Sequence, residues 1–430
     1  DTIALASGAS QTGFGRSGSV NWQTSIKTTG FTAVSGEGYF CDTSSGGFTV
    51  TLPASPSAGD IVAVKDYANT FDTYSLTLAR NGSNIGGLAQ DSLVTQEGIA
   101  VTLVYADATK GWLVTDSGLQ SEAPGPTFIS ATGGTVTTVD TNFKVHTFTG
   151  PGTFCVSAVG NPAGSNTISY MVVAGGGGAG GDSGGGGGAG GFREGKTPQC
   201  TYTSSPIACT SGSNNGMPVL ATSYPVTVGG GGSAGSGAPP GGSPAQGGDG
   251  SVSTFAGTTT ITSAGGGGGG SRPSVNGRPG GSGGGARTQA GSAGSGNTPP
   301  TTPSQGFDGA GATPTPTGNS GGGGGATALG VYNTTPASGA GGPGGAGATT
   351  SINGTPTAFA GGGGGGGSTS PDQAGGTGGA GGGGNGEQGG PGDTGNSGTT
   401  NTGGGGGGGG DDATGGSGGS GIVIIRYKFQ

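Results

Sequence analysis

The sequence predicts two unlike parts: an all-β N-terminal part, and a bundle of polyglycine helices of the polyproline II type, with negligible α-helix. Three observations lead to this fold class. Glycine accounts for 117 of the 430 residues, far above the roughly 7% of ordinary proteins. Of these glycines, 94 follow Tyr170, so the composition changes abruptly there. Short strand patterns precede that boundary, and one apolar strand pattern closes the chain.

Residues 1–117 are expected to form a β-rich module, with the opening residues 3–18 as a connector. Apolar and polar residues alternate, or run as short apolar stretches, at 47–53, 61–66, 74–78 and 99–105. Such runs, bounded by turn residues, are typical of strands, and Asn81-Gly82 is typical of a tight turn. The regular spacing of the strands favours a compact sandwich or barrel-like module.

Residues 118–126 are expected to be a proline-containing linker, and residues 127–174 a β platform. Its strands are predicted at 127–129, 135–137, 143–148, 152–156 and 168–173. Residues 422–430 form a further apolar strand pattern at the end of the chain. We expect this closing strand to pair with the strands at 143–173. The glycine region, 175–421, is then one long insertion whose ends are held together by the platform.

Within the glycine region, short apolar stretches repeatedly lead into glycine runs, and loops rich in Pro, Thr, Asn and Ser separate the runs. Collagen requires glycine at every third position, which runs such as 265–270 and 403–410 do not keep. A flexible linker remains an alternative, because glycine loses more backbone entropy on ordering than any other residue. Regular apolar lead-ins and a closing strand favour packed three-fold helices that run back and forth and bond to one another. Ala, Ser and Asn within the runs are expected at the rim.

The charge pattern excludes several partners. The net charge is −8, and the thirteen Lys and Arg residues are scattered along the chain. We therefore expect neither nucleic acid nor an anionic membrane as a partner. No stretch has the roughly 20 consecutive apolar residues of a membrane-spanning helix, and the N-terminus lacks signal-peptide features. Export by the general secretory route is not expected.

The sequence offers little chemistry. His146 is the single histidine and lies in a strand pattern, where a packed or surface role is expected and a general base is not. Asp411, Asp412 and Asp393 lack the ligand spacing of a calcium loop. Asp107 and Asp116 are interpreted as turn residues. No catalytic residue, metal or cofactor is predicted.

The four cysteines do not form a metal-binding pattern, because no cluster of Cys and His ligands accompanies them. Cys200 and Cys209 are close in sequence, and either a disulfide or two thiols is compatible with that spacing. Cys41 and Cys155 lie in strand patterns and are expected to be small buried residues.

Three resemblances concern the architecture. Features in residues 22–117 resemble a β-module common in phage tail fibres, namely Trp22, Phe31-Thr32-Ala33, Gly38-Tyr39-Phe40, Asp42-Thr43, Thr49–Pro53, Gly59-Asp60, Leu103-Val104-Tyr105 and Gly111-Trp112. That resemblance implies a trimeric shaft or knob module. Residues 171–421 resemble the glycine-rich adhesins at the tips of T-even-like phage tail fibres. The ending Gly421–Tyr427 is similar to glycine-rich tail proteins of marine phages.

The resemblances imply a non-enzymatic tail-fibre protein of the virion that acts outside the cell and attaches the phage to a host receptor, an outer-membrane protein or a glycan. Other tail-fibre or virion proteins, and two further copies in a homotrimer, are the remaining expected partners. The alternative is a purely structural fibre or surface-layer component. Binding energy concentrates in aromatic and arginine side chains, so the loops supply the candidate receptor-binding residues. These are Tyr202, Tyr224, Arg272, Asn276, Arg278, Phe307, Tyr332 and Asn333.

Overall fold

The computed structural model describes residues 20–122, 125–209, 216–237, 244–287, 291–311, 320–333, 340–368, 373–389, 392 and 394–430. The chain divides into two compact units, 1–125 and 126–430. Among the described residues the regular elements are β-strands and one short 3₁₀ helix, η1 (Gln120–Glu122). The predicted fold class, all-β with negligible α-helix, is confirmed.

The first unit is a pair of sheets. One has the order β1-β3-β5-β8-β9, formed by Asn21–Lys27, Glu37–Cys41, Ile61–Asp66, Ile99–Asp107 and Gly111–Leu119. The other has the order β2-β4-β6-β7, formed by Phe31–Thr32, Thr49–Thr51, Leu76–Ala79 and Ser92–Val94. The first six strands alternate between the two sheets and therefore pair in parallel, which the sequence pattern did not indicate. Strands β8 and β9 add an antiparallel hairpin.

The core of this unit lies between the two sheets and contains the fully buried side chains of Trp112, Leu103 and Phe71. Strand β9 continues to Leu119, inside the segment expected to be a linker, because it pairs with β8 as far as Ile99.

The second unit begins with a platform of two sheets. The sheet β10-β13-β17-β18-β19 contains Ser130–Thr132, Gly152–Ala158, Ser223–Thr227, Ser253–Ala256 and Thr260–Ser263. The sheet β11-β12-β22-β14-β15 contains Thr135–Val139, Phe143–Phe148, Ile422–Lys428, Thr167–Val173 and Phe192–Gly195, and β16 (Met217–Pro218) also pairs with β14. A separate hairpin is formed by β20 (Ala348–Thr350) and β21 (Thr357–Phe359). No strand forms at 127–129, where the Thr127 carbonyl instead accepts the amides of Asn161 and Ser165.

The closing strand occupies the centre of its sheet. Strand β22 pairs antiparallel with β12 on one side and with β14 on the other, which confirms the predicted pairing. Its alternate side chains enter two different cores, with Ile425 in the core between the sheets and Ile424 in the core on the opposite face. Burial on both faces explains why this segment is apolar along most of its length.

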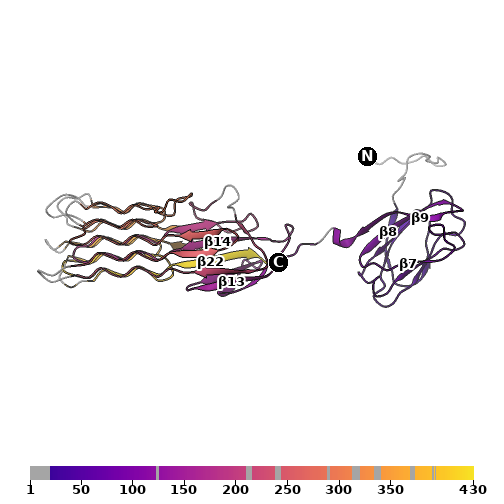
Figure 1. The fold of residues 1–430 in the computed structure, drawn as a ribbon, viewed down its shortest axis with the longest axis horizontal. Coiled ribbons are helices and arrows are strands. Elements are labelled where there is room, and N and C mark those ends of the chain that lie inside the picture. The colour runs from indigo at the N-terminus through magenta and orange to yellow at the C-terminus, as the bar shows by residue number, and fades with distance from the viewer. Residues whose placement is uncertain are drawn as a thin grey trace, which may run out of the picture. The chain divides into compact units, whose positions relative to one another are not determined.

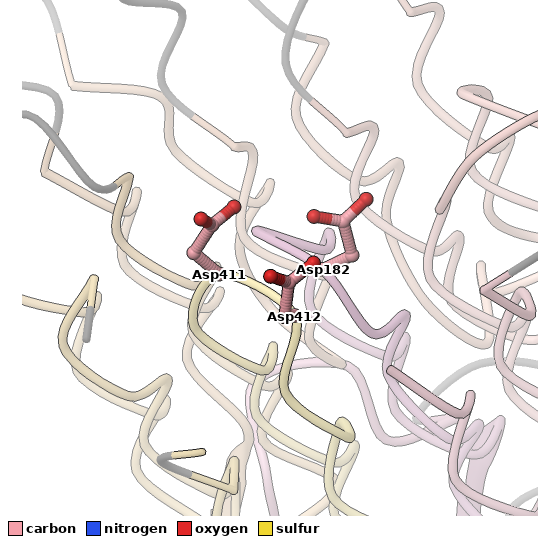
Figure 2. Close-up of side chains that lie close together, drawn as sticks. All are labelled: Asp182, Asp411 and Asp412. Carbon is pink, nitrogen blue, oxygen red and sulfur yellow. The ribbon is translucent and has the colours of Figure 1, made fainter. Parts of the chain in front are cut away.

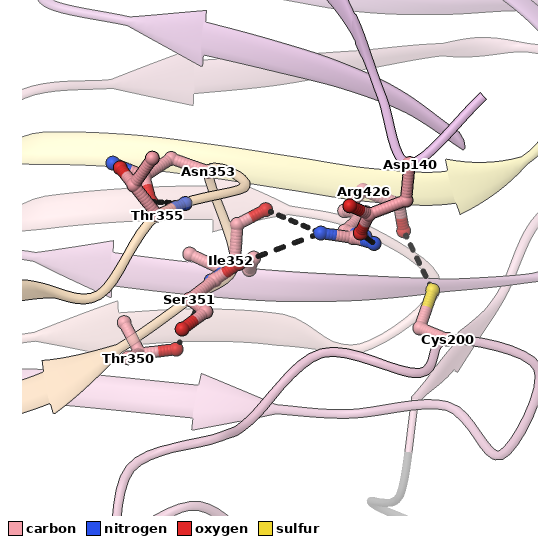
Figure 3. Close-up of polar contacts among 8 residues, drawn as sticks. All are labelled: Asp140, Cys200, Thr350, Ser351, Ile352, Asn353, Thr355 and Arg426. Atoms are coloured by element: carbon pink, nitrogen blue, oxygen red, sulfur yellow. Dashed lines mark hydrogen bonds and ion pairs between the residues drawn. The ribbon is translucent and has the colours of Figure 1, made fainter. Parts of the chain in front are cut away.

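Arg426 is the exception in that apolar run, and it is fully buried. Its guanidinium lies over the ring of Phe143, 4.5 Å from the centroid, and Nη2 is 2.5 Å from Oδ2 of Asp140. Nη1 donates to the carbonyls of Ser351 and Ile352 at 3.4 Å (Figure 3). The closing strand is thereby tied to the turn between β20 and β21.

The glycine runs extend side by side from the sheets (Figure 1). The run at 175–180, which follows β14, shows how they bond. Its successive amides donate to the carbonyls of Ser251, Gly419, Gly188, Gly248, Gly416 and Gly185. These acceptors lie on three neighbouring runs, which the successive amides contact in turn. Each neighbouring run accepts a second hydrogen bond from the amide three residues later. That rotation is the three-residue turn of a polyproline II type helix.

The carbonyls of the same run are also used in rotation. They accept from the amides of Gly266, Gly232, Gly406, Gly269, Gly235 and Gly409, in order along 175–180. These donors lie on three further runs, so this helix bonds to six neighbours. All twelve of these hydrogen bonds measure between 2.8 and 3.1 Å. A lattice of backbone hydrogen bonds thus takes the place of a side-chain core.

Not every position within the runs excludes a side chain. Ala, Ser and Asn were expected at the rim, yet Ala189, Ser282 and Ser320 are fully buried. The Ala189 methyl packs in a core cluster with Phe192, and the Ser320 hydroxyl donates to the Gly366 carbonyl. The expectation was wrong at these positions because a small side chain also fits where a run adjoins the platform core or an accepting carbonyl, whereas Ser233 and Asn385 are exposed as expected.

Candidate functional site

The candidate site lies at the end of the glycine bundle farthest from the sheets, which we call the tip. Here the outgoing runs turn and return toward the platform. The turn at 181–184 and the turn at 410–413 are neighbours, because Asp182 N donates to the Ala413 carbonyl at 2.9 Å and Ser183 N to the Gly410 carbonyl at 2.8 Å. The first and last runs of the region therefore meet at the tip.

Two of the predicted receptor-binding residues are buried at the platform. Tyr202 is 5% exposed and lies beneath Arg426, whose guanidinium is 5.1 Å from its ring centroid. Tyr224 is 4% exposed, belongs to β17, and bonds through its hydroxyl to the backbone of Leu220. The expectation of an exposed loop was wrong because both rings fill cores formed with distant strands.

Phe307 is also displaced from the expected position. It is half-buried, and its amide donates to the Gly325 carbonyl while its carbonyl accepts from Gly283. Nearby, the carbonyl of Gln305 accepts from Phe192 of β15. Phe307 therefore begins a run at the platform end and is not part of a tip loop.

The three polar candidates at 272–278 are exposed, but each is engaged. Arg272 and Asn276 lie in the turn after the run 265–270, whereas the Arg278 amide bonds to the Gly268 carbonyl on the side of the bundle. Arg272 Nε lies 2.5 Å from Oδ2 of Asp182, and Arg278 Nη2 lies 2.6 Å from Oδ2 of Asp249. Asn276 accepts the Ser292 amide through Oδ1 at 2.8 Å. These residues join neighbouring runs as well as facing solvent.

Tyr332 and Asn333 line a hollow of about 460 Å³ near the tip. Pro343, Thr377 and the backbone of adjoining glycines complete its wall. The Tyr332 side chain is 45% exposed. This hollow combines an accessible aromatic ring with polar groups, which suits recognition of a small ligand or a chain end.

Cys200 and Cys209 are present as thiols, and no disulfide joins them. The Cys200 sulfur is buried and points toward the carbonyl oxygen of Arg426, 3.9 Å away (Figure 3). Burial raises the pKa of the Cys200 thiol, which keeps it protonated and unreactive. The backbone of Cys209 instead forms a bridge with Gly195.

A cluster of charged residues at the tip was not anticipated as a unit. Asp182, Asp411 and Asp412 each offer a carboxylate oxygen within 4.8 Å of the others. Arg272 and Arg287 both contact Asp182. The sequence showed only the adjacent pair Asp411-Asp412, because Asp182 belongs to a run at the other end of the glycine region. Asp393 lies outside the described residues.

Two of the side chains considered for catalysis form hydrogen bonds that stabilise the fold. His146 is fully buried between the Gly133 carbonyl, 2.7 Å from Nδ1, and the Tyr427 hydroxyl, 3.1 Å from Nε2. Asp107 accepts the amides of Thr109 and Lys110 and so closes a turn, as expected. Asp116 was also expected in a turn, but it lies within β9 opposite Thr102.

Among the described residues, the structure contains no α-helix with the length and hydrophobicity that a membrane span requires. A comparison with curated proteins gives no match. A family model described as a glycine-rich domain matches residues 147–428, which span most of the platform, the whole glycine region and the closing strand. The chain therefore belongs to this glycine-rich domain family.

Proposed function

We propose that this protein is a non-enzymatic adhesin of a phage tail fibre, which attaches the virion to a receptor on the host surface through the tip of its glycine bundle. The single observation that carries the proposal is the arrangement of the runs. The lattice uses backbone groups for its own cohesion and projects its turns at the end remote from the platform. Such a scaffold holds variable loops in fixed positions without needing any of their side chains.

The composition of the tip supports a binding role. Tyr332 is an accessible aromatic residue beside a hollow of about 460 Å³. Arg272 at the tip and Arg278 on the side of the bundle add exposed cationic groups, with 54% and 45% of their side chains accessible. Aromatic and arginine side chains dominate binding energy at interfaces. An outer-membrane protein or a glycan is the proposed receptor, and the first unit is proposed to serve attachment and trimerisation within the fibre.

The second candidate is a purely structural fibre or surface-layer component. One observation favours it: the two exposed arginines already pair with Asp182 and Asp249, and Asn276 holds the amide of Ser292. Those contacts stabilise the tip whether or not a receptor binds. Tyr332 is the residue that separates the two candidates most clearly, because its ring is 45% exposed and lines the hollow.

The test is binding of fluorescently labelled protein to candidate host cells. We expect the variant Tyr332→Ala with Arg278→Ala to lose at least tenfold in affinity, since two anchors contribute about 2 kcal/mol or more when they are hot spots. The matched control is Tyr67→Ala with Tyr74→Ala in the first unit, whose side chains are 52% and 45% exposed. Wild-type affinity for a folded tip variant would contradict the proposed binding surface. Absence of binding to any cell by the wild type would favour the structural alternative.

A further inference from the structure

Three carboxylates converge at the tip from two turns that lie far apart in the sequence. Asp182 follows the first outgoing glycine run, whereas Asp411 and Asp412 follow the last. Figure 2 shows the Asp412 side chain between those of Asp182 and Asp411. The three offered oxygens lie within 4.8 Å of one another. Like charges held this close repel, so the arrangement calls for a positive partner among them.

Asp182, the most buried member of the cluster, has one carboxylate oxygen with hydrogen-bond partners and one without. Asp182 is completely buried, and its Oδ2 lies 2.5 Å from Arg272 Nε and 3.2 Å from Arg287 Nη2. Its Oδ1 is buried and has no hydrogen-bond partner among the described residues. A buried carboxylate oxygen without a partner is costly, because its desolvation is not compensated by a hydrogen bond or a cation. This oxygen is therefore free to act as a ligand atom for a cation.

The two arginines do not supply that ligand. Both contact the opposite oxygen of Asp182, and the Nε of Arg287 donates to the Asp182 main-chain carbonyl at 2.7 Å. With three carboxylates and two guanidinium groups, the cluster has an excess of negative charge when all are ionised. The cluster thus favours uptake of positive charge.

We propose that Asp182, Asp411 and Asp412 bind a divalent cation of the calcium type at the tip. Calcium takes carboxylate oxygens at roughly 2.3–2.6 Å, so one ion can contact oxygens that lie as far as about 4.8 Å apart. Magnesium needs shorter distances of about 2.0–2.1 Å and near-octahedral geometry, so it suits this spacing less well. Water completes the coordination, because Asp411 and Asp412 are only partly buried. The ion links the first and last hairpins of the glycine bundle.

A shared proton is the competing occupant. A protonated Asp411 carboxyl can donate a hydrogen bond to Asp182. One proton joins only two of the three carboxylates, however, and leaves Asp412 ionised beside them. A cation contacts all three at once. The two occupants respond differently to added metal at neutral pH, which makes the choice testable.

The test is equilibrium dialysis of the full chain against radioactive calcium at pH 7.5, with free Ca²⁺ up to about 1 mM, the range of extracellular calcium modules. We expect one ion per chain, and at least tenfold weaker binding by the variant Asp411→Asn with Asp412→Asn. The matched control, Asp72→Asn with Asp116→Asn, makes the same charge change at exposed positions of the first unit and should bind as the wild type does.

A second measurement guards against misfolding of the tip variant, namely its far-ultraviolet circular dichroism and melting temperature in EDTA. The spectrum should match that of the wild type in EDTA, since both then lack the ion, and the melting temperature should be equal or higher, since the variant has less charge repulsion at the tip. The proposal is overturned if the wild type binds no calcium at about 1 mM, or if the folded tip variant binds it as tightly as the wild type. Neither readout depends on cell adhesion, so the cation site and the receptor-binding role can fail independently.

Discussion

Gly187 faces the carbonyl oxygen of Gly177 across the lattice so closely that a Cβ atom on Gly187 would lie 2.1 Å from that oxygen. The obstacle is backbone held by its own hydrogen bonds, so it cannot rotate away as a flexible side chain would. Gly230, by contrast, is exposed at the rim, and a Cβ atom there would meet nothing within 4 Å. The two positions form a matched pair.

We expect Gly187→Ala to destabilise the glycine unit by about 3 kcal/mol or more, because neighbouring runs must separate to admit the methyl group. Gly230→Ala should change the free energy of unfolding by less than about 1 kcal/mol, with a stabilising sign, because it restricts the unfolded chain. Denaturant unfolding followed by circular dichroism measures both. Equal stability of the two variants would show that the lattice is not packed as described.

The closing strand is expected to be indispensable to the second unit. Removing residues 421–430 takes the central strand out of its sheet and leaves β12 and β14 without a common neighbour. It also removes Arg426, which bonds the turn at Ser351 and Ile352. We expect the truncated chain to lose its cooperative melt and to be cleaved rapidly by protease within the glycine runs. A chain lacking only Gln430 is the control, and protease resistance of the longer truncation comparable to that control would contradict the prediction.

His146 should make the second unit sensitive to acid. Because a carbonyl only accepts hydrogen bonds, Nδ1 donates to Gly133, and the Tyr427 hydroxyl donates to Nε2. Burial, the largest effect, lowers the pKa of His146 below its ordinary 6.5, so the folded state keeps the ring neutral. The unfolded state then binds the proton more readily. The stability that this neutral ring contributes is present above about pH 6.5 and is lost as pH falls from 6.5 through the folded pKa.

The measurement is the free energy of unfolding between pH 7.5 and 4.5 for the wild type and for His146→Gln. Glutamine retains a donor and an acceptor but does not titrate in this range. Below pH 6.5 we expect the free energy of unfolding to fall less steeply for the variant than for the wild type. The carboxylates contribute equally to the pH dependence of both proteins. If the free energy of unfolding falls equally in both proteins, protonation of His146 does not destabilise the folded state, and the prediction is wrong.

The first unit is expected to associate into a trimer. Leu93 on β7 and Val114 on β9 are 63% and 58% exposed and line an apolar hollow of about 290 Å³. Glutamate at both positions should yield monomers in light scattering at micromolar concentration, because like charges would be buried at the subunit contact. Tyr74→Glu, at a 45% exposed residue outside the hollow, is the control. A monomeric wild type would contradict the expectation.

Much of the architecture could be predicted because backbone chemistry dictates it. Glycine runs of this length can bury their amides only by bonding to one another, and the apolar terminal strand needed a sheet. The contents of the tip could not be predicted. Asp182 meets Asp411 only because the first and last runs are lattice neighbours, an adjacency that no local pattern encodes. Tyr202 looked like a loop residue because its partner, Arg426, lies at the other end of the chain.

The three-fold rotation of the amides has a consequence for how such a chain can change in length. One residue inserted within 175–180 would turn every later amide by a third of a turn, toward a neighbour whose carbonyl is already taken. Insertion of three residues restores the direction of every later amide, but it makes this run longer than its six neighbours. Natural variation in length should therefore occur mainly in the turns. The glycine runs should change in length only by multiples of three residues, and neighbouring runs should change together.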